Sequence, residues 1–325
     1  MKHLLLISTS FPDDAFAPGQ EAAGGFVADF AKALASHVSL SIVAPSLKTA
    51  VQQHSNVTIH RFGVPSLPLS LLKPQNPAHW SSIVQTLRSG QQAVTEAVAK
   101  QKPDHIISLW ALHSGAWARR VAKQHNIPYR CWPLGSDIWP LGQVPVVRSL
   151  LRTVLRDATR CFADGFVLAD DTSAISSLPC EFLPSSRKLD ISQPKPLAQS
   201  PPYKLAFLGR WHPNKGIDLL LESLKLLDER CWQQIEAVKI FGGGPMEDEV
   251  KTAVSQLQAA SRPIQLGGYL NQAEATNLFL WADYQLIPSR IESIPVIFSD
   301  AMQANCPIVT MPVGDLPRLV QEYAP

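Results

Sequence analysis

The sequence lacks the features that mark several large classes of protein. No run of apolar residues approaches 18 in length, so no transmembrane helix is predicted. The opening segment, MKHLLLISTS, turns polar too early for a signal peptide. The five cysteines are odd in number, widely spaced and without a CxxC pair, which argues against a disulfide framework or a zinc site. These absences predict a cytoplasmic protein with reduced thiols.

Charge is also scarce, at 17% of residues and a net value of +2, which is too weak a balance to indicate a nucleic-acid partner. No GxGxxG motif follows a predicted strand with an acidic residue about 20 positions on, which argues against a nicotinamide dehydrogenase. An Asp-x-Asp motif is missing too, in agreement with chemistry that needs no metal. Apolar residues make up 46% of 325 residues, enough for two buried cores.

Short apolar runs alternate with helix-period patterns along the chain, which predicts parallel sheets covered by helices on both faces. Strands are expected at 4–7, 38–43, 57–62, 106–110, 129–132, 161–166, 205–208, 237–241, 264–266, 284–287 and 308–310. Four prolines fall within nine residues near 194–202, which indicates an extended linker over 189–202. We therefore expect an N-terminal Rossmann-like domain over 1–188 and a C-terminal one over 203–325, with ligands in the cleft between them.

The stretch LAFLGRWHPNKGID, from Leu205, reads as a strand, a cationic turn and a helix. Arg210 and Lys215 lie in the turn, at the carboxyl end of the strand where open α/β sheets bind ligands. Two fixed positive charges beside a helix N-terminus suit a diphosphate. The alternative is one arginine and one lysine on an ordinary surface turn.

Glycine clusters follow two other predicted strands. Gly24 and Gly25 end the long loop that begins at Ser8, and a Gly-Gly-Gly-Pro run that includes Gly243 follows the strand at 237–241. Missing Cβ atoms let backbone N–H groups approach a ligand closely. Both clusters could equally serve only to form tight turns.

Two acidic motifs complete the set. Glu292 precedes a helix expected from about residue 294, where the N–H groups of Ser293, Ile294 and Val296 could face a phosphate, and Asp300 lies eight residues beyond Glu292. Carboxylates at both positions suit vicinal hydroxyls; a capping glutamate with a solvated aspartate is the alternative. Asp137, in Gly-Ser-Asp after the strand at 129–132, is expected either to touch a sugar or to form an Asx turn.

Taken in chain order, these motifs resemble one family. Gly-Gly near the start, Gly-Ser-Asp in the middle, GRxxxxKG from Gly209, GGGP from Gly242 and the ExxxxxxxD pair are similar to those of family 4 retaining glycosyltransferases, the glycosyl transferases group 1. The resemblance covers nearly the whole chain and is most specific over 207–221 and 286–320. It implies an α/β fold of the GT-B class, with two Rossmann-like parallel-sheet domains facing each other across a cleft.

The resemblance also implies roles. Arg210 and Lys215 would hold the donor diphosphate and Glu292 would meet hydroxyls of the transferred sugar, so these three are the expected catalytic residues. Further donor contacts are implied for Gly243, for Tyr269 beside the base, for the backbone of Ser293, Ile294 and Val296, and for Asp300 at the ribose. Gly24, Gly25 and Asp137 are expected on the acceptor side.

The chain departs from the family pattern in three ways. Asp300 stands where a glutamate is usual and is one methylene shorter, and Leu134 replaces a histidine that commonly precedes the Gly-Ser-Asp triplet. Family members usually continue with helices beyond the position of Pro325, so we expect either a second domain truncated at its C-terminus or a compact variant.

The resemblance implies transfer of a sugar from a nucleotide-diphosphate donor to a hydroxyl of a glycan or lipid-linked acceptor, with retained configuration and without a metal or other cofactor. The leaving phosphate itself would take the acceptor's proton. Two alternatives stay open, a nucleotide-sugar epimerase and a non-catalytic protein that binds nucleotide.

Two features bear on the acceptor. The segment 64–80 is apolar and Pro-rich, and Arg148, Arg152, Arg156 and Arg160 are spaced four apart, which forms a positive stripe if one helix carries all four. Together they suggest peripheral contact with the anionic inner face of a membrane. The alternative is a loop packed on its own domain beside a solvated helix face.

Overall fold

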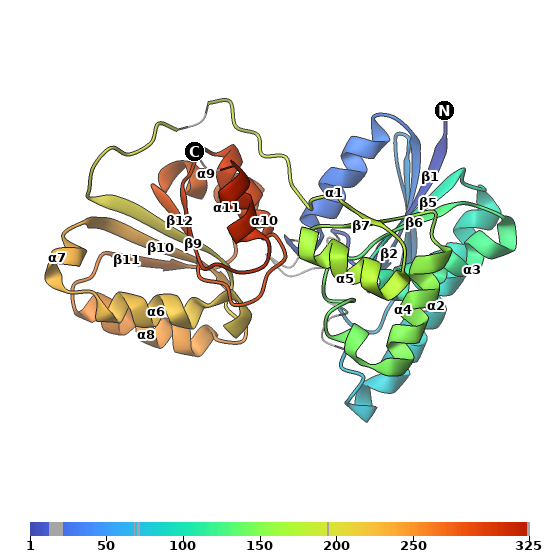
Figure 1. Ribbon diagram of the computed structural model, residues 1–325, viewed down its shortest axis with the longest axis horizontal. Coiled ribbons are helices and arrows are strands. Elements are labelled where there is room, and N and C mark those ends of the chain that lie inside the picture. The colour runs from blue at the N-terminus through green and yellow to red at the C-terminus, as the bar shows by residue number, and fades with distance from the viewer. Residues whose placement is uncertain (13–21, 68, 70–71, 194, 324–325) are drawn as a thin grey trace. The chain divides into compact units, whose positions relative to one another are not determined.

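The structure is a computed structural model that describes residues 1–12, 22–67, 69, 72–193 and 195–323. The chain divides into two compact units, Met1–Ser185 and Ser186–Pro325, each built on its own parallel sheet (Figure 1). Within the described residues, no helix is both long enough and apolar enough to cross a bilayer. The predicted fold class, α/β with two Rossmann-like parallel-sheet domains, is confirmed.

The first unit contains an eight-stranded sheet in the order β3-β4-β2-β1-β5-β6-β7-β8, parallel except for the β3–β4 pair. Its strands are β1 (His3–Ile7), β2 (Ser39–Ser46), β3 (Ala50–His54), β4 (Val57–Gly63), β5 (His105–Leu109), β6 (Tyr129–Trp132), β7 (Arg160–Ala163) and β8 (Cys180–Phe182). Its helices are α1 (Ala22–Ala35), α2 (Trp80–Lys100), α3 (Ala116–His125), α4 (Pro145–Asp157) and α5 (Phe166–Ser176).

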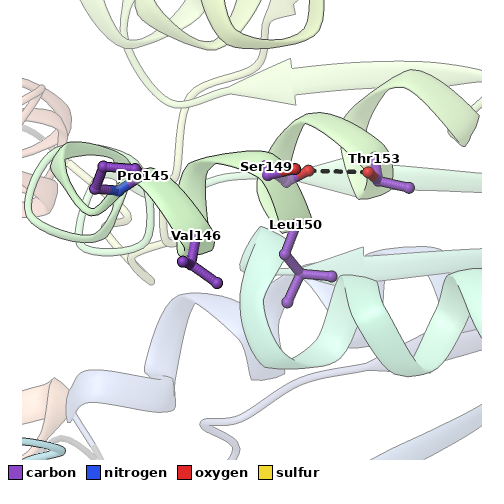
Figure 2. A pocket seen from close by; sticks show the side chains of 5 residues that line it. All are labelled: Pro145, Val146, Ser149, Leu150 and Thr153. Atoms are coloured by element: carbon purple, nitrogen blue, oxygen red, sulfur yellow. Dashed lines mark hydrogen bonds between the residues drawn. The ribbon is translucent and has the colours of Figure 1, made fainter.

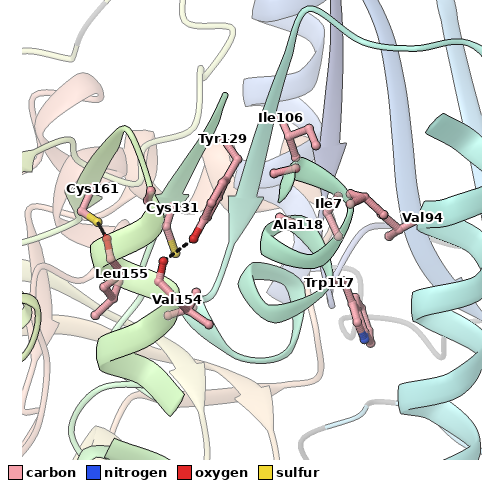
Figure 3. Packing of buried hydrophobic residues seen from close by; sticks show 14 of the residues in the cluster. Ile7, Val94, Ile106, Trp117, Ala118, Tyr129, Cys131, Val154, Leu155 and Cys161 are labelled. Carbon is pink, nitrogen blue, oxygen red and sulfur yellow. Dashed lines mark hydrogen bonds between the residues drawn. The ribbon is translucent and has the colours of Figure 1, made fainter. Parts of the chain in front are cut away.

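Alternation along β1 explains why this sheet is covered on both faces. Leu5 and Ile7 belong to a core that includes side chains of α2, α3, α4 and α5, whereas Leu4 and Leu6 belong to a second core with α1. Figure 3 shows the first core, where the Tyr129 hydroxyl donates to the main-chain oxygen of Val154. The continuous apolar run at the start of the sequence is therefore the centre of the unit.

The second unit has five parallel strands in the order β11-β10-β9-β12-β13. These are β9 (Tyr203–Arg210), β10 (Ile235–Gly243), β11 (Ile264–Gly267), β12 (Tyr284–Ile287) and β13 (Ile308–Thr310). Its helices are α6 (Ile217–Leu226), α7 (Glu229–Trp232), α8 (Glu247–Ala259), α9 (Gln272–Trp281), α10 (Val296–Gln303) and α11 (Leu316–Tyr323). On β9, Phe207 packs with α6 and α8, and its neighbour Ala206 packs with α9 and α10.

The Pro-rich segment lies against the second unit over much of its length. Leu189 is buried in the core formed with α9 and α10. Lys195 pairs with Asp283 at 2.8 Å, and its main-chain oxygen accepts from Asn305 Nδ2 at 2.8 Å. The boundary between the two units lies between Ser185 and Ser186, a few residues before this segment. Its action as a linker between domains stays a prediction.

The predicted elements match the structure best where strands are buried on both faces, and fail at the sheet edges. The strand expected over 161–166 ends at Ala163, because Gly165 is the N-cap of α5, which begins at Phe166. Strand β3 was not predicted because its sequence, AVQQH, has no alternation of apolar and polar residues. In the structure all five of its residues are exposed. The short edge strand β8 was missed because it spans three residues without a buried position.

Candidate functional site

The order of strands in the second unit fixes where a site can form. From β9 the chain adds β10 and β11 on one side and then crosses to add β12 on the other side. The loops after β9 and β12 therefore diverge at the carboxyl edge, which is the position at which open α/β sheets bind ligands. Lys215 follows β9 and Glu292 follows β12, so two of the predicted catalytic residues lie at this position, which is called the switch point of the sheet.

Lys215 and Glu292 meet there as an ion pair. The ammonium of Lys215 donates to Oε1 of Glu292, and the hydroxyl of Ser289 donates to the same oxygen at 3.0 Å. The Lys215 side chain is 38% exposed and that of Glu292 is 12% exposed, so the cation stays accessible while the carboxylate is largely enclosed. The structure thus joins two side chains that are 77 residues apart in sequence.

The turn that carries Lys215 is held by a side-chain cap and by a close contact between two backbone segments. His212 Nδ1 accepts from the N–H of Asn214 at 3.1 Å and caps the short helix Pro213–Lys215. Gly216 then takes a left-handed conformation with φ of +68°, and a Cβ at this position would lie 1.8 Å from the main-chain oxygen of Pro288. The turn after β9 therefore rests directly on the loop after β12, and only glycine allows this approach.

Arg210, Gly243 and Tyr269 form a second group at the carboxyl edge of the same sheet, where Arg210 of β9 lies opposite Gly243 of β10. The N–H of Trp211 donates to the oxygen of Gly243 at 2.8 Å, and a Cβ on Gly243 would lie 2.7 Å from the Tyr269 ring. Arg210 and Tyr269 are exposed. Among the described side chains, Arg210 has no carboxylate within ion-pair distance, so its guanidinium is available to an anionic ligand.

The loop between Glu292 and α10 differs from expectation. Helix α10 begins at Val296 rather than near residue 294, because Pro295 is extended and forms its N-cap. The oxygen of Ser293 accepts from the N–H of Asp315 at 3.2 Å, and Ile294 is buried. The amides of Ser293 and Ile294 therefore precede the helix, and their contact with phosphate stays a prediction.

Asp300 does not join this group. Its side chain has no exposed surface and forms an ion pair with Arg187, whose side chain is 17% exposed. The carboxylate expected at the nucleoside ribose is thus enclosed by the protein in this structure. Arg187 was not a candidate in the sequence, because its partner lies 113 residues away and no local pattern links them.

In the first unit, Asp137 is buried and accepts hydrogen bonds from the N–H groups of Ala111 and Leu134. Burial raises its pKa to about 6, opposed by these and other backbone N–H groups. Neither donor is the N–H two residues further on that defines an Asx turn, so the carboxylate instead joins the loop after β6 to the loop after β5. The side chain has almost no exposed surface, and its acceptor-side role stays a prediction.

Gly24 and Gly25 lie in the first turn of α1, and residues 13–21 of the preceding loop lie outside the described part of the chain. A Cβ on Gly24 would lie 3.0 Å from atoms of Phe11 and Pro12. The missing Cβ of Gly24 therefore accommodates the chain's own loop. Contact of either glycine with a ligand stays a prediction.

Two polar residues were missed at strand ends. Ser289 bonds the Glu292 carboxylate, and its position directly after a predicted strand was the available signal. His113 follows β5. In the first sheet the chain adds β2 and β4 on one side of β1 and then adds β5 on the other side, so the loops after β1 and β5 diverge at this point. The residue keeps solvent-exposed surface while its ring packs near Trp117, and desolvation lowers the pKa of the ring.

A surface hollow on α4 is lined by none of these residues (Figure 2). It measures about 630 Å³ and is lined by Pro145, Val146, Ser149, Leu150 and Thr153. Val146 and Leu150 point to the same side of the helix and are 81% and 46% exposed. An apolar hollow with two hydroxyls offers no group that could bind a diphosphate.

The second unit is a parallel α/β domain with two cations and glycine-rich turns at the carboxyl edge of its sheet, an arrangement suited to an anionic ligand. Residues 202–324 match the family described as Glycosyl transferases group 1. The predicted resemblance to glycosyl transferases group 1 is thus confirmed over the second unit, which is the part of the chain that this family matches.

Named proteins agree with this assignment. The chain is 29% identical over 117 residues to an uncharacterized glycosyltransferase of Methanocaldococcus jannaschii, covering 36% of this chain and 29% of that protein. It is 26% identical over 199 residues to a GDP-mannose-dependent alpha-(1-6)-phosphatidylinositol monomannoside mannosyltransferase of Mycobacterium tuberculosis, covering 55% and 51%. The matched regions thus span about a third to a half of these relatives.

A likeness of fold extends over almost the whole chain. Sucrose-phosphate synthase from Thermosynechococcus elongatus superposes with a TM-score of 0.68 at 16% identity, covering 98% of this chain and 84% of that one. At this identity the likeness bears on the fold alone, and it agrees with the predicted GT-B class.

Proposed function

We propose that this protein is a retaining glycosyltransferase that moves a sugar from a nucleotide-diphosphate donor to a hydroxyl of a glycan or lipid-linked acceptor. The observation that carries the proposal is the ion pair of Lys215 and Glu292 at the switch point of the second sheet, with Arg210 exposed at the end of β9. The M. tuberculosis relative is named for a nucleotide-sugar donor and a lipid acceptor, which is consistent with this chemistry.

In the proposed reaction, the bond between the sugar's anomeric carbon and the donor phosphate breaks while positive charge develops on the ring. Arg210 and Lys215 stabilise the negative charge that builds on the departing diphosphate, a task that needs no metal when cations are already in place. Glu292, oriented by Ser289, accepts hydrogen bonds from sugar hydroxyls. The acceptor hydroxyl bonds to the anomeric carbon on the face that the phosphate leaves, and its proton passes to that phosphate.

A screen of UDP-, GDP- and ADP-sugars by thermal shift tests donor binding. A ligand that binds only the folded state at about 100 times its Kd stabilises the protein by roughly 2.7 kcal/mol, so one nucleotide class is expected to raise Tm by several degrees. The anomeric configuration of the transferred sugar, read by NMR, then tests retention. No shift with any nucleotide sugar would contradict the proposal.

The two alternatives give different outcomes in the same assays. An epimerase interconverts free nucleotide sugars without an acceptor, so product analysis without acceptor detects it. A non-catalytic protein would bind donor without turning it over; the enclosed Asp300 and the presence of Leu134 are the observations that favour it.

We further propose that α4 contacts an anionic membrane surface that presents the acceptor. Val146 and Leu150 are exposed, and so are Arg152 and Arg156, about 120° further around the helix. The exposed part of α4 therefore carries both apolar and basic side chains. Arg160 does not extend the stripe, because α4 ends at Asp157 and Arg160 lies in β7, where it pairs with Glu181 at 3.5 Å. The segment 64–80 is partly packed on the first core through Leu67 and Leu69.

Co-sedimentation with vesicles tests this contact. Each basic residue near an anionic surface contributes about 1 kcal/mol, so Arg152→Glu with Arg156→Glu is expected to lower binding to anionic vesicles about 30-fold. The double variant Lys225→Glu with Arg230→Glu in the second unit changes the net charge equally and should bind like the wild type. Binding of the wild-type protein that does not depend on anionic lipid would contradict the proposed contact.

A further inference from the structure

Asp300 and Arg187 form the most enclosed ion pair of the described residues. The Asp300 side chain is 0% exposed and accepts from Nη2 of Arg187. A carboxylate at this depth is stable as a charge only when a cation stays beside it. Arg187 is the second residue of the second unit, so the pair ties the start of that unit to helix α10.

Side chains of α9 and α10 also bond the backbone beside Arg187. Gln303 Nε2 donates to the oxygen of Arg187 at 2.8 Å, and Gln303 Oε1 accepts from the N–H of Leu189 at 3.1 Å. Gln272 Nε2 donates to the oxygen of Lys188 at 2.9 Å. Residues 187–189 are thus held by both their backbone and a charged side chain, and we call this set of contacts the clasp.

The clasp acts on the helix that follows the candidate site. Asp300 lies one helical turn beyond Val296, the first residue of α10, and the Glu292–Pro295 loop runs directly into that residue. An anchor at Asp300 therefore limits movement of the loop that places Glu292 against Lys215. No described atom of Asp300 is open to a ligand, since the side chain has no exposed surface.

We propose that the ion pair with Arg187 holds the Asp300 carboxylate within the clasp, so that Asp300 anchors α10 and does not bind the ribose of a bound nucleotide. The part of this proposal that concerns ribose rests on the proposed donor site. The part that concerns the anchor rests only on contacts within the second unit. The two parts therefore require separate measurements.

The anchor is tested by a double-mutant cycle on the whole chain. Arg187→Leu removes the cation beside a buried carboxylate and is expected to lower Tm by about 10 °C. Arg187→Leu with Asp300→Leu replaces the pair by apolar side chains and should recover at least half of that loss. Arg262→Met is the control, because its partner Glu229 is 73% exposed, and it should change Tm by about 2 °C or less. If the losses in Tm caused by Arg187→Leu and by Asp300→Leu simply add in the double variant, the anchor is overturned.

The ribose assignment is tested by nucleotide affinity at a temperature well below each Tm. The probe is whichever of UDP, GDP and ADP binds the wild type, compared with its 2′-deoxy form. The ratio of the two Kd values is expected to agree within about two-fold among the wild type, the double leucine variant and Asp300→Asn. A wild-type ratio of ten or more that falls towards one in the Asp300 variants would overturn the assignment. If none of the three nucleotides binds, the proposed donor site fails, and the anchor is still judged by the cycle.

Discussion

Replacing Lys215 by alanine is expected to lower kcat/KM for sugar transfer about 100- to 1,000-fold. In the proposed reaction the diphosphate leaves with added negative charge, and Lys215 is the partly exposed cation at the switch point. Removal of one preorganised group that stabilises developing charge typically costs about 3 to 4 kcal/mol of transition-state stabilisation. The substitution also leaves Glu292, which is 12% exposed, without its cation, so donor binding is expected to weaken as well.

Initial rates with saturating acceptor and varied donor measure this effect. Lys225→Ala is the matched control, because Lys225 lies on α6, close in sequence, and makes only a 3.4 Å pair with Glu222 on the same helix. Its turnover should stay within about two-fold of the wild type, since such surface pairs contribute little. Full activity of Lys215→Ala, with normal folding, would remove the basis for the proposed transferase.

The family resemblance implied one donor site for Lys215 and Glu292, and the structure brings them together because each follows a buried strand and parallel strands end at one edge of a sheet. The strand limits Tyr129–Trp132, Tyr284–Ile287 and Ile308–Thr310 agree with the prediction to the residue. Buried parallel strands leave a strong signal in the sequence, since both faces are apolar.

What the sequence could not predict depends on contacts between distant segments. The burial of Asp300 follows from Arg187, and the enclosure of Asp137 follows from the N–H of Ala111, which lies after a different strand. An aspartate looks the same in a sequence whether its carboxylate binds a ligand, caps a turn or pairs with a distant arginine. The composition of a motif can therefore indicate a candidate site, but it does not separate acids that bind a ligand from acids that are structural.

Gly216→Ala is expected to reduce the free energy of unfolding of the second unit by about 3 to 5 kcal/mol, and Tm by about 10 °C. The left-handed conformation, with φ of +68°, costs an alanine roughly 1 to 2 kcal/mol by itself. The new Cβ would also lie 1.8 Å from the oxygen of Pro288, a backbone atom that can retreat only if the end of β12 moves. Both effects act on the same turn, so the sum exceeds that of an ordinary surface substitution.

Thermal and chemical denaturation of Gly216→Ala and Gly268→Ala provide a matched comparison. A Cβ on Gly268 would meet no atom within 4 Å, and that residue does not need positive φ, so its substitution should change the free energy of unfolding by about 0.5 kcal/mol or less. Gly216→Ala is also expected to lose donor binding, because movement of the turn after β9 or of the loop after β12 separates Lys215 from Glu292. Equal stability of the two variants would show that the close contact between Gly216 and Pro288 does not hold the candidate site together.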